Sequence, residues 1–143
     1  MIKYHILPTA QACGCKFDKP RKGDAGYDIY ASEHVILFAG EQKTVATGLV
    51  IQLPELHVGI IKDRSSMALR GLHTHGGVID SSYRGFISVL VEYTGKDSYH
   101  IEPGQRIAQM LIVPIVKPDT AIVEFEDLTV TERGNGAFGS TGK

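Results

Sequence analysis

Short apolar runs rich in β-branched residues, separated by turn formers, constrain the fold of this chain more than any other feature. Turn signals such as Ala39-Gly40 and Glu102-Pro103-Gly104 stand between these runs. Strands are expected at residues 3–7, 35–38, 44–53, 57–62, 86–93, 99–101, 107–116 and 121–125. Strands at this spacing indicate an all-β sandwich or closed barrel.

Helical periodicity is confined to one stretch of the sequence. Residues 65–70 predict a helix of about two turns, with a serine cap at its start and Gly71 as its stop. Parallel strands need long crossover connections, usually helices, and the sequence offers none, so a parallel α/β sheet is excluded. The 143 residues fit one domain with one core.

Charge and hydrophobicity exclude two classes of partner. A formal net charge of −1 provides no global basic field for a nucleic-acid polymer. No apolar run approaches the roughly 18 residues of a membrane span, and residues 1–8 lack the features of a secretory signal. Cys13 and Cys15 are too close for a good disulfide and are expected to stay thiols. We therefore expect a cytoplasmic protein, with a nuclear or organellar location left open.

The C-terminal segment differs from the rest of the chain. Residues 131–143 contain four glycines and one large apolar residue, so this segment cannot bury enough surface to fold alone. It is either a frayed tail or an arm that becomes ordered on a ligand. Composition alone favours the frayed tail. The expected organisation is one domain at residues 1–130, followed by a flexible glycine-rich segment at residues 131–143.

Five segments place glycine beside charged or polar residues and interrupt the strand pattern. They are 24–28, 63–66, 77–85, 104–109 and the C-terminal segment. Glycine lets the backbone approach a ligand closely, and arginine offers a planar fork of donors to phosphate oxygens. Serine adds a hydroxyl and a backbone N–H. Each of these features alone is a weak signal, because turn glycines and arginine-serine pairs are common, but together they are compatible with a small anionic ligand.

In this order, the five segments resemble the five motifs of the trimeric dUTP pyrophosphatase family (dUTPase, deoxyuridine 5'-triphosphate nucleotidohydrolase). The resemblance spans Asp24 to Gly142, and residues 77–85 and 133–142 are its most specific parts. It implies a jelly-roll-like β-barrel or sandwich subunit with one short helix, and a homotrimer. It also implies Mg²⁺-dependent hydrolysis of dUTP to dUMP and pyrophosphate. This reaction limits uracil incorporation into DNA and supplies dUMP for thymidylate synthesis.

The resemblance assigns the base, the sugar and the attacking water to the third motif. Asp80 matches the aspartate that activates the water, since a carboxylate can accept its proton. Tyr83 matches the ring that packs where a ribose 2′-hydroxyl would lie, which disfavours UTP. Backbone groups of a hairpin at about residues 74–79, including Gly77, Val78 and Ile79, are expected to bind uracil.

The resemblance assigns phosphate and metal binding to three other motifs. Arg64, Ser65 and Ser66 are expected on the α- and β-phosphates, and Gln109 is expected to contact phosphate directly or through water. Asp28 is expected to act on Mg²⁺ through water, because Mg²⁺ keeps much of its hydration. Serine near the bridging oxygen would stabilise the charge that develops as pyrophosphate leaves.

The resemblance also gives the C-terminal segment a role as a closing arm. Arg133 is expected to pair with the γ-phosphate, and Phe138 is expected to stack on uracil. The backbone N–H groups of Gly139, Ser140 and Thr141 are expected to cradle phosphate. In the family this arm comes from a neighbouring subunit, so that each site draws on three chains.

Two residues depart from the family pattern. Thr74 stands where many relatives carry asparagine, and Asp63 stands where proline or glycine is expected. An acid beside a phosphate site is unfavourable unless it points away. Arg106, in the fourth motif, is an alternative structural residue that would bridge carboxylates between subunits.

Two alternatives compete with hydrolysis of dUTP. A dCTP deaminase-type enzyme of the same fold needs an acid/base group for the cytosine amine, and no extra glutamate lies near the third motif. A nucleotide-sensing regulatory homologue is favoured by loss of a catalytic residue, and none of the matched residues is lost. The sequence therefore predicts a dUTP diphosphatase.

Overall fold

The computed structural model describes residues 1–135, and in this part of the chain every strand pairing is antiparallel. The strands are β1 Lys3–Ile6, β2 Tyr27–Tyr30, β3 Val35–Phe38, β4 Gln42–Ala46, β5 Leu49–Gln52, β6 His57–Asp63, β7 Leu72–His75, β8 Val78–Asp80, β9 Ser88–Tyr93, β10 Ser98–Ile101 and β11 Arg106–Pro114. Two short α-helices, α1 Pro8–Ala12 and α2 Ser65–Ala68, and a 3-10 helix, η1 Phe125–Asp127, accompany them. Within residues 1–135, no helix has the length and apolar character needed to cross a membrane.

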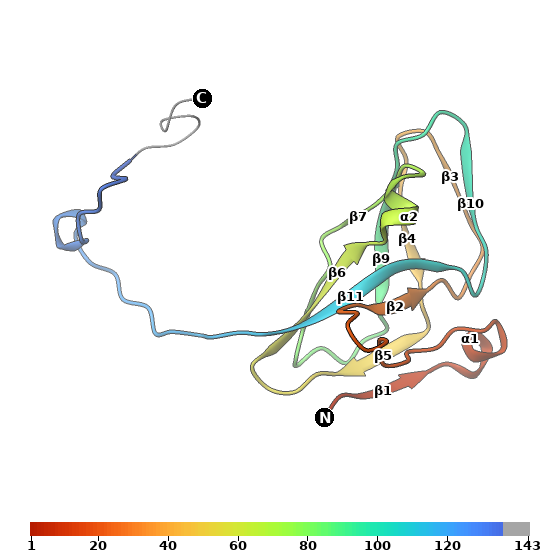
Figure 1. Ribbon diagram of the computed structural model, residues 1–143, viewed down its shortest axis with the longest axis horizontal. Helices are drawn as coiled ribbons and strands as arrows, with labels where there is room; N and C mark the ends of the chain where they lie inside the picture. Colours follow the sequence, from red (N-terminus) through yellow and green to blue (C-terminus); the bar gives the residue numbers. More distant parts are fainter. Residues whose placement is uncertain (136–143) are drawn as a thin grey trace.

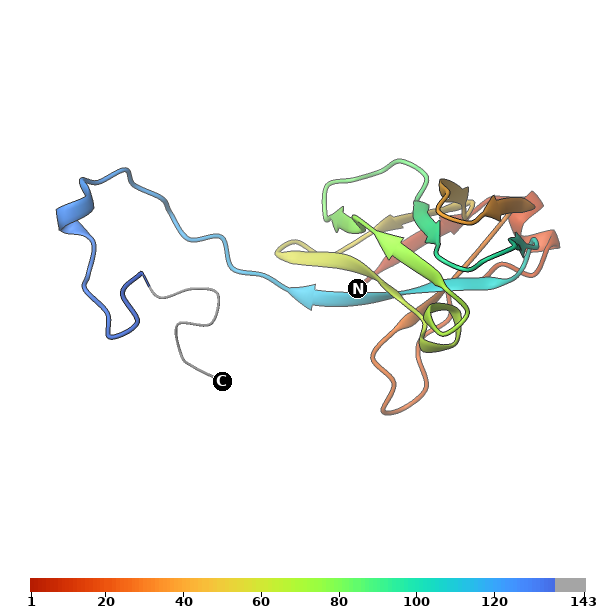
Figure 2. The same cartoon turned by 90° about the horizontal axis from the view of Figure 1, so that it is seen from above.

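The strands form two main sheets and two ribbons around one core (Figures 1 and 2). One sheet has the order β2-β11-β6-β8 and the other has the order β4-β9-β7, while β1 pairs with β5 and β10 with β3. Ile29, Ile61 and Met110 come from the first sheet, and Val45 and Val91 from the second, into the same buried cluster. The core therefore fills the space between the sheets.

Alternation along the strands explains why each sheet has one buried face. In β9, Val89, Val91 and Tyr93 are buried while the residues between them are more exposed. Successive side chains of a strand point to opposite faces, so a period of two directs these residues inward. This pattern confirms the all-β expectation.

The expected strand at residues 44–53 is two strands instead of one. Gly48, between β4 and β5, has a φ of +66°, a left-handed conformation that breaks the extended backbone. Buried Thr47 fixes this break, because its Oγ1 donates to the Ile87 carbonyl at 2.6 Å and accepts from Leu49 N–H at 3.1 Å. A sequence window of β-branched residues does not reveal such a tertiary hydrogen bond.

The helix expectations are partly wrong. The helix expected at residues 65–70 ends as α2 at Ala68, and its N-cap is Arg64 instead of a serine. Gly71 does have a positive φ of +83°, as expected of a stop residue. The short α1 was not expected. Pro8 starts it, and a proline is favoured at that position because its missing N–H would have no partner there.

The chain leaves the body after β11 (Figures 1 and 2). Residues 116–135 are exposed throughout, and the strand expected at 121–125 is absent among them. A strand needs a second backbone to bond with, and within the described chain no strand of the body reaches this segment. Its exposed apolar side chains are Val116, Ile122, Val123, Phe125, Leu128 and Val130.

Candidate active site

A cleft of about 1030 Å³ gathers the expected phosphate and metal residues. Its lining comes from the loop before β2, from β2 itself, from the start of α2 and from β11. The expected residues in the lining are Asp28, Arg64, Ser65, Ser66 and Gln109. The fold therefore brings together residues that lie as far as 81 positions apart in the sequence.

The cleft is locally cationic although the chain is close to neutral. Five cationic side chains line it, against three carboxylates. The cations are Lys16, Lys19, Arg21, Arg64 and Arg106, and the carboxylates are Asp18, Asp24 and Asp28. A concave surface with an excess of positive charge concentrates anions, so the cleft suits a polyanionic ligand such as a triphosphate.

Asp28 lies between two arginines at the floor of this cleft. Arg64 Nε lies 2.9 Å from Asp28 Oδ1, and Arg106 Nη1 lies 3.1 Å from Asp28 Oδ2. The Arg64 side chain is 21% exposed, so this pair is better shielded from water than an ordinary surface pair. Asp28 thus holds both guanidinium groups in place, and Arg106 pairs with a carboxylate of its own chain.

A β-bulge turns Arg106 and Gln109 to the same face of β11. In the pairing with β2, Arg106 is opposite Tyr30 and Gln109 is opposite Asp28, with a register shift between Arg106 and Ala108. Tyr30 and Asp28 are two residues apart and share a face. A regular strand would place residues three apart on opposite faces, so the extra residue of the bulge is what directs both side chains into the cleft.

Gly26 is a residue of the cleft that the sequence analysis did not assign to the site. A Cβ at this position would collide with the Gln109 side-chain amide oxygen. Gln109 Nε2 also donates to the Asp63 carbonyl at 2.8 Å. Glycine therefore leaves the room in which the Gln109 amide is held. The basic residues at 16–22, also missed, had a signal in the sequence as a cluster of positive charge ahead of the first motif.

Asp63 points away from the cleft and binds Thr74. Its Oδ1 accepts from the Thr74 backbone N–H at 2.7 Å and from the Thr74 hydroxyl at 2.6 Å, and its Oδ2 lies 3.1 Å from His73 Nδ1. The two departures from the family pattern are therefore partners of each other. Their hydrogen bonds connect the end of β6, just before Arg64, to strand β7.

A second, smaller cavity of about 260 Å³ holds the expected base and sugar residues. Its lining is Val78, Ile79, Asp80, Tyr83, Phe86, Ile87 and Ser88. Tyr83 is 44% exposed, and its hydroxyl donates to the Phe86 carbonyl at 3.1 Å, which fixes the ring over the cavity. The Tyr83 N–H bonds to the Asp80 carbonyl at 3.1 Å, so Asp80 begins a tight turn.

Strand β8 exposes one edge of its backbone. It is the last strand in the order β2-β11-β6-β8, so only its β6 side is paired among the described residues. The expected hairpin at 74–79 is not a paired hairpin, because β7 pairs with β9 and β8 pairs with β6. Gly77 makes the transition, with a φ of +89° and a Cβ position only 2.8 Å from Ile61 Cβ.

The two cavities lie at opposite ends of β6. Asp80 pairs with Val58, near the start of the strand, whereas Arg64 follows Asp63, its last residue. Five residues of extended strand span about 17 Å. Within one chain, the structure therefore brings Arg64, Ser65, Ser66 and Gln109 together and keeps Asp80 and Tyr83 apart from them.

Comparisons with known proteins identify the family. The dUTPase family model matches residues 16–142. A deoxyuridine 5'-triphosphate nucleotidohydrolase of Cutibacterium acnes is 44% identical over 146 aligned residues, which cover 96% of this chain and 91% of the relative. The chain belongs to the dUTPase family.

Solved dUTPase structures share the fold. The dUTPase of Staphylococcus bacteriophage 80alpha with dUPNHPP superposes with a TM-score of 0.89 at 29% identity, over 100% of this chain and 99% of that one. A mutant dUTPase from phage phi11 of S. aureus, whose structure shows the coordination of a structural Mg(II) ion, has a TM-score of 0.79 at 25% identity, over 89% and 99%. The expected jelly-roll-like dUTPase fold is confirmed.

The tail residues of the fifth dUTPase motif are only partly described. Arg133 lies in the exposed arm after η1. Phe138, Gly139, Ser140 and Thr141 lie outside the described residues. Their roles stay predictions.

Asp63 gives this dUTPase a testable response to acid. Burial acts to raise the pKa of Asp63, but the hydrogen bonds from Thr74 and His73 outweigh burial and hold the pKa below its ordinary value. Because the unfolded-state pKa is about 3.9, the ionised carboxylate stabilises the fold above about pH 4. This contribution is lost as the pH falls through the lower, folded-state pKa.

We expect urea unfolding at fixed protein concentration to show a steeper loss of stability below about pH 4 for the wild type than for Asp63→Asn. The amide keeps the shape and an acceptor for the Thr74 N–H, but it does not titrate. Equal slopes in the two proteins would show that Asp63 is not held as described.

Proposed function

We propose that the protein hydrolyses dUTP to dUMP and pyrophosphate, thereby limiting uracil incorporation into DNA and supplying dUMP for thymidylate synthesis. The observation that carries the proposal is the cationic cleft, in which four motif residues that the family devotes to phosphate lie together around Asp28. They are Arg64, Ser65, Ser66 and Gln109. Family membership supports the substrate.

The second cavity suits the deoxyuridine end of the substrate. The free edge of β8 offers backbone N–H and C=O groups at Val78 and Ile79, and such groups can match a uracil edge and mismatch cytosine. Tyr83 presents a ring where a ribose 2′-hydroxyl would need a partner. A hydroxyl buried against this ring would lose its hydrogen bonds to water, which disfavours UTP.

The proposed reaction is in-line attack of water on the α-phosphorus. Asp80 orients the water and accepts its proton, because a carboxylate at the mouth of the cavity can reach a water beside the sugar. Arg64, Ser65 and Gln109 neutralise charge on the departing pyrophosphate. The start of α2 adds the Ser65 and Ser66 N–H groups, which have no partner within a helix of this length.

The cleft fits a Mg²⁺ ion that is held mainly by the substrate. Mg²⁺ keeps several waters and takes one or two carboxylates together with phosphate oxygens. Both Asp28 oxygens already contact arginines, so Asp28 suits a hydrogen bond to a metal-bound water better than direct coordination. When bound, the ion would supply charge neutralisation on the triphosphate.

We propose that each complete site is shared between subunits of a homotrimer. Asp80 must touch the water that attacks the same phosphate that Arg64 and Ser65 hold, yet about 17 Å of strand separate them in one chain. A second copy can supply the missing half. The exposed apolar side chains of residues 116–130, which precede the arm, include Ile122, Phe125 and Val130, and they also favour docking of this segment on a neighbouring chain.

We propose that the arm closes over the bound nucleotide from a third subunit. Arg133 is suited to pair with the γ-phosphate, and Phe138 to stack on uracil, while the N–H groups of Gly139, Ser140 and Thr141 cradle phosphate. Closure would exclude bulk water from the reaction.

The substrate and the base are tested by measuring pyrophosphate release from dUTP, UTP, dCTP and dTTP with and without Mg²⁺. Of the four nucleotides, we expect only dUTP to release pyrophosphate rapidly, and only when Mg²⁺ is present. We expect dCTP to release no ammonia. Asp80→Asn should lower turnover by about 10²- to 10⁴-fold while nucleotide binding persists. No turnover of dUTP with Mg²⁺ would refute the proposed function, and ammonia release would favour the deaminase alternative.

Site sharing is tested by mixing two inactive variants, Asp80→Asn and Arg64→Ala, through unfolding and refolding. If Asp80 and Arg64 of one site come from different chains, random mixed trimers regain up to about a quarter of wild-type turnover. Each variant refolded alone is the control. If mixing restores nothing although mixed trimers are detected by mass spectrometry, both residues act from the same chain.

Closure by the arm is tested by a chain that ends at Glu132. We expect turnover to fall by about 10²-fold or more, because a cation and several N–H donors are removed from the site. Circular dichroism and size-exclusion chromatography should match the full-length protein. A truncated protein with normal turnover would contradict the proposed role of the arm.

A further inference from the structure

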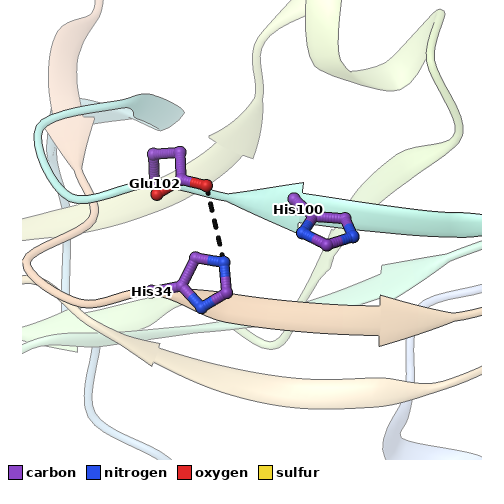
Figure 3. A group of neighbouring side chains, drawn as sticks. All are labelled: His34, His100 and Glu102. Atoms are coloured by element: carbon purple, nitrogen blue, oxygen red, sulfur yellow. Dashed lines mark ion pairs between the residues drawn. The ribbon is translucent and has the colours of Figure 1, made fainter.

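Two histidines and a glutamate meet at one end of the β3–β10 ribbon (Figure 3), and none of the three lines either of the two cavities described above. His34 immediately precedes β3, His100 lies within β10, and Glu102 immediately follows β10. His34 Nε2 lies 3.4 Å from Glu102 Oε1, and the rings of His34 and His100 are 5.8 Å apart at their centroids.

Strand register places the three side chains on one face. Ile101 pairs with Val35 and His100 pairs with Ile36, so one further step of the ladder sets Glu102 opposite His34. His100 and Glu102 are two residues apart and share a face of the ribbon. The intervening Ile101 is buried in the core, so that shared face is the outer one.

The distances suit a single ion. The three candidate ligand atoms all lie within 4.8 Å of one another. Bonds of about 2.0–2.2 Å in a tetrahedral site place ligand atoms about 3.3 Å apart. The His34–Glu102 pair already has nearly this spacing. All three side chains are exposed, so small rotations at the surface can close the remaining gaps.

In this cluster, the hydrogen bonds and ion pair described leave the His100 ring able to coordinate a metal ion. A His34–Glu102 ion pair accounts for two of the three residues, whereas among residues 1–135 the hydrogen bonding of His100 is a long contact of 3.4 Å with Ser98 Oγ. His73 and His75, on β7, differ from His100, because Asp63 holds His73 and Glu92 holds His75 at 2.7 Å. Among residues 1–135, no other group of His, Cys, Asp and Glu converges in this way.

We propose that His34, His100 and Glu102 bind one divalent transition-metal ion of the imidazole-preferring class, with Zn²⁺ as the representative ion and water completing its coordination. Imidazole suits Zn²⁺, Ni²⁺, Co²⁺ and Cu²⁺, whereas Mg²⁺ prefers oxygen ligands in an octahedron. The site therefore differs in chemistry from the cationic cleft, although His100 also lines a neighbouring pocket that shares Arg64, Ser66 and Arg106 with that cleft. Bound metal would tie the ends of β3 and β10 together.

The test is isothermal titration calorimetry, in which ZnCl₂ is added to the full-length protein in the presence of excess Mg²⁺ and the affinity and stoichiometry are measured. We expect one Zn²⁺ per chain, and a loss of at least about tenfold in affinity for His34→Ala, for His100→Ala and for Glu102→Gln. His57→Ala, which removes a histidine elsewhere, and the double variant His73→Ala/His75→Ala are the matched controls and should bind as the wild type does.

The location of the metal is checked by Co²⁺, whose visible absorption reports its ligands. Intense bands of a four-coordinate ion in the wild type that disappear in His100→Ala support the site. Absence of Zn²⁺ binding by the wild type would overturn the proposal. Wild-type affinity in all three cluster variants, or loss of binding only in the His73→Ala/His75→Ala protein, would overturn it as well.

Discussion

The double pairing of β6 is the constraint on which the rest of the site depends. β11 bonds to one side of it and β8 to the other. A slip of one residue in either ladder would turn every side chain of the slipped strand to the wrong face, so the register is fixed by the core. The distance between Asp80 and the cationic cleft is consequently a property of the sheet, and loop motion cannot remove it.

Ion pairs position the charged side chains that line the cleft. Asp28 orients two arginines, and the cleft remains cationic because further basic residues line the preceding loop. Asp63 adds a second acid beside Arg64, yet its carboxylate is occupied by Thr74 and His73. An acid at this position is therefore compatible with phosphate binding, because its hydrogen bonds direct it toward β7.

Much of the fold could be predicted from alternation, since strands such as β3 and β9 show a period of two or a compact apolar run. Features set by tertiary contacts could not. Thr47 divides residues 44–53 through a hydrogen bond to Ile87, and the bulge beside Arg106 exists only relative to β2. The motif residues were predicted from the resemblance to the dUTPase family that their order along the chain carries. Their division between two cavities depends on the β6–β8 register, which no motif encodes.

The free edge of β8 has a consequence for how selectivity can change over time. If this edge reads the base as proposed, it does so with main-chain atoms that every amino acid except proline possesses, so most side-chain replacements at Val78 or Ile79 leave those atoms in place. Only a change in the path of the backbone would move them. That path depends on Gly77, whose conformation and closeness to Ile61 leave little freedom for replacement. Under the proposed mode of recognition, preference for the base would tolerate most point mutations in β8 and would be most sensitive to replacement of Gly77.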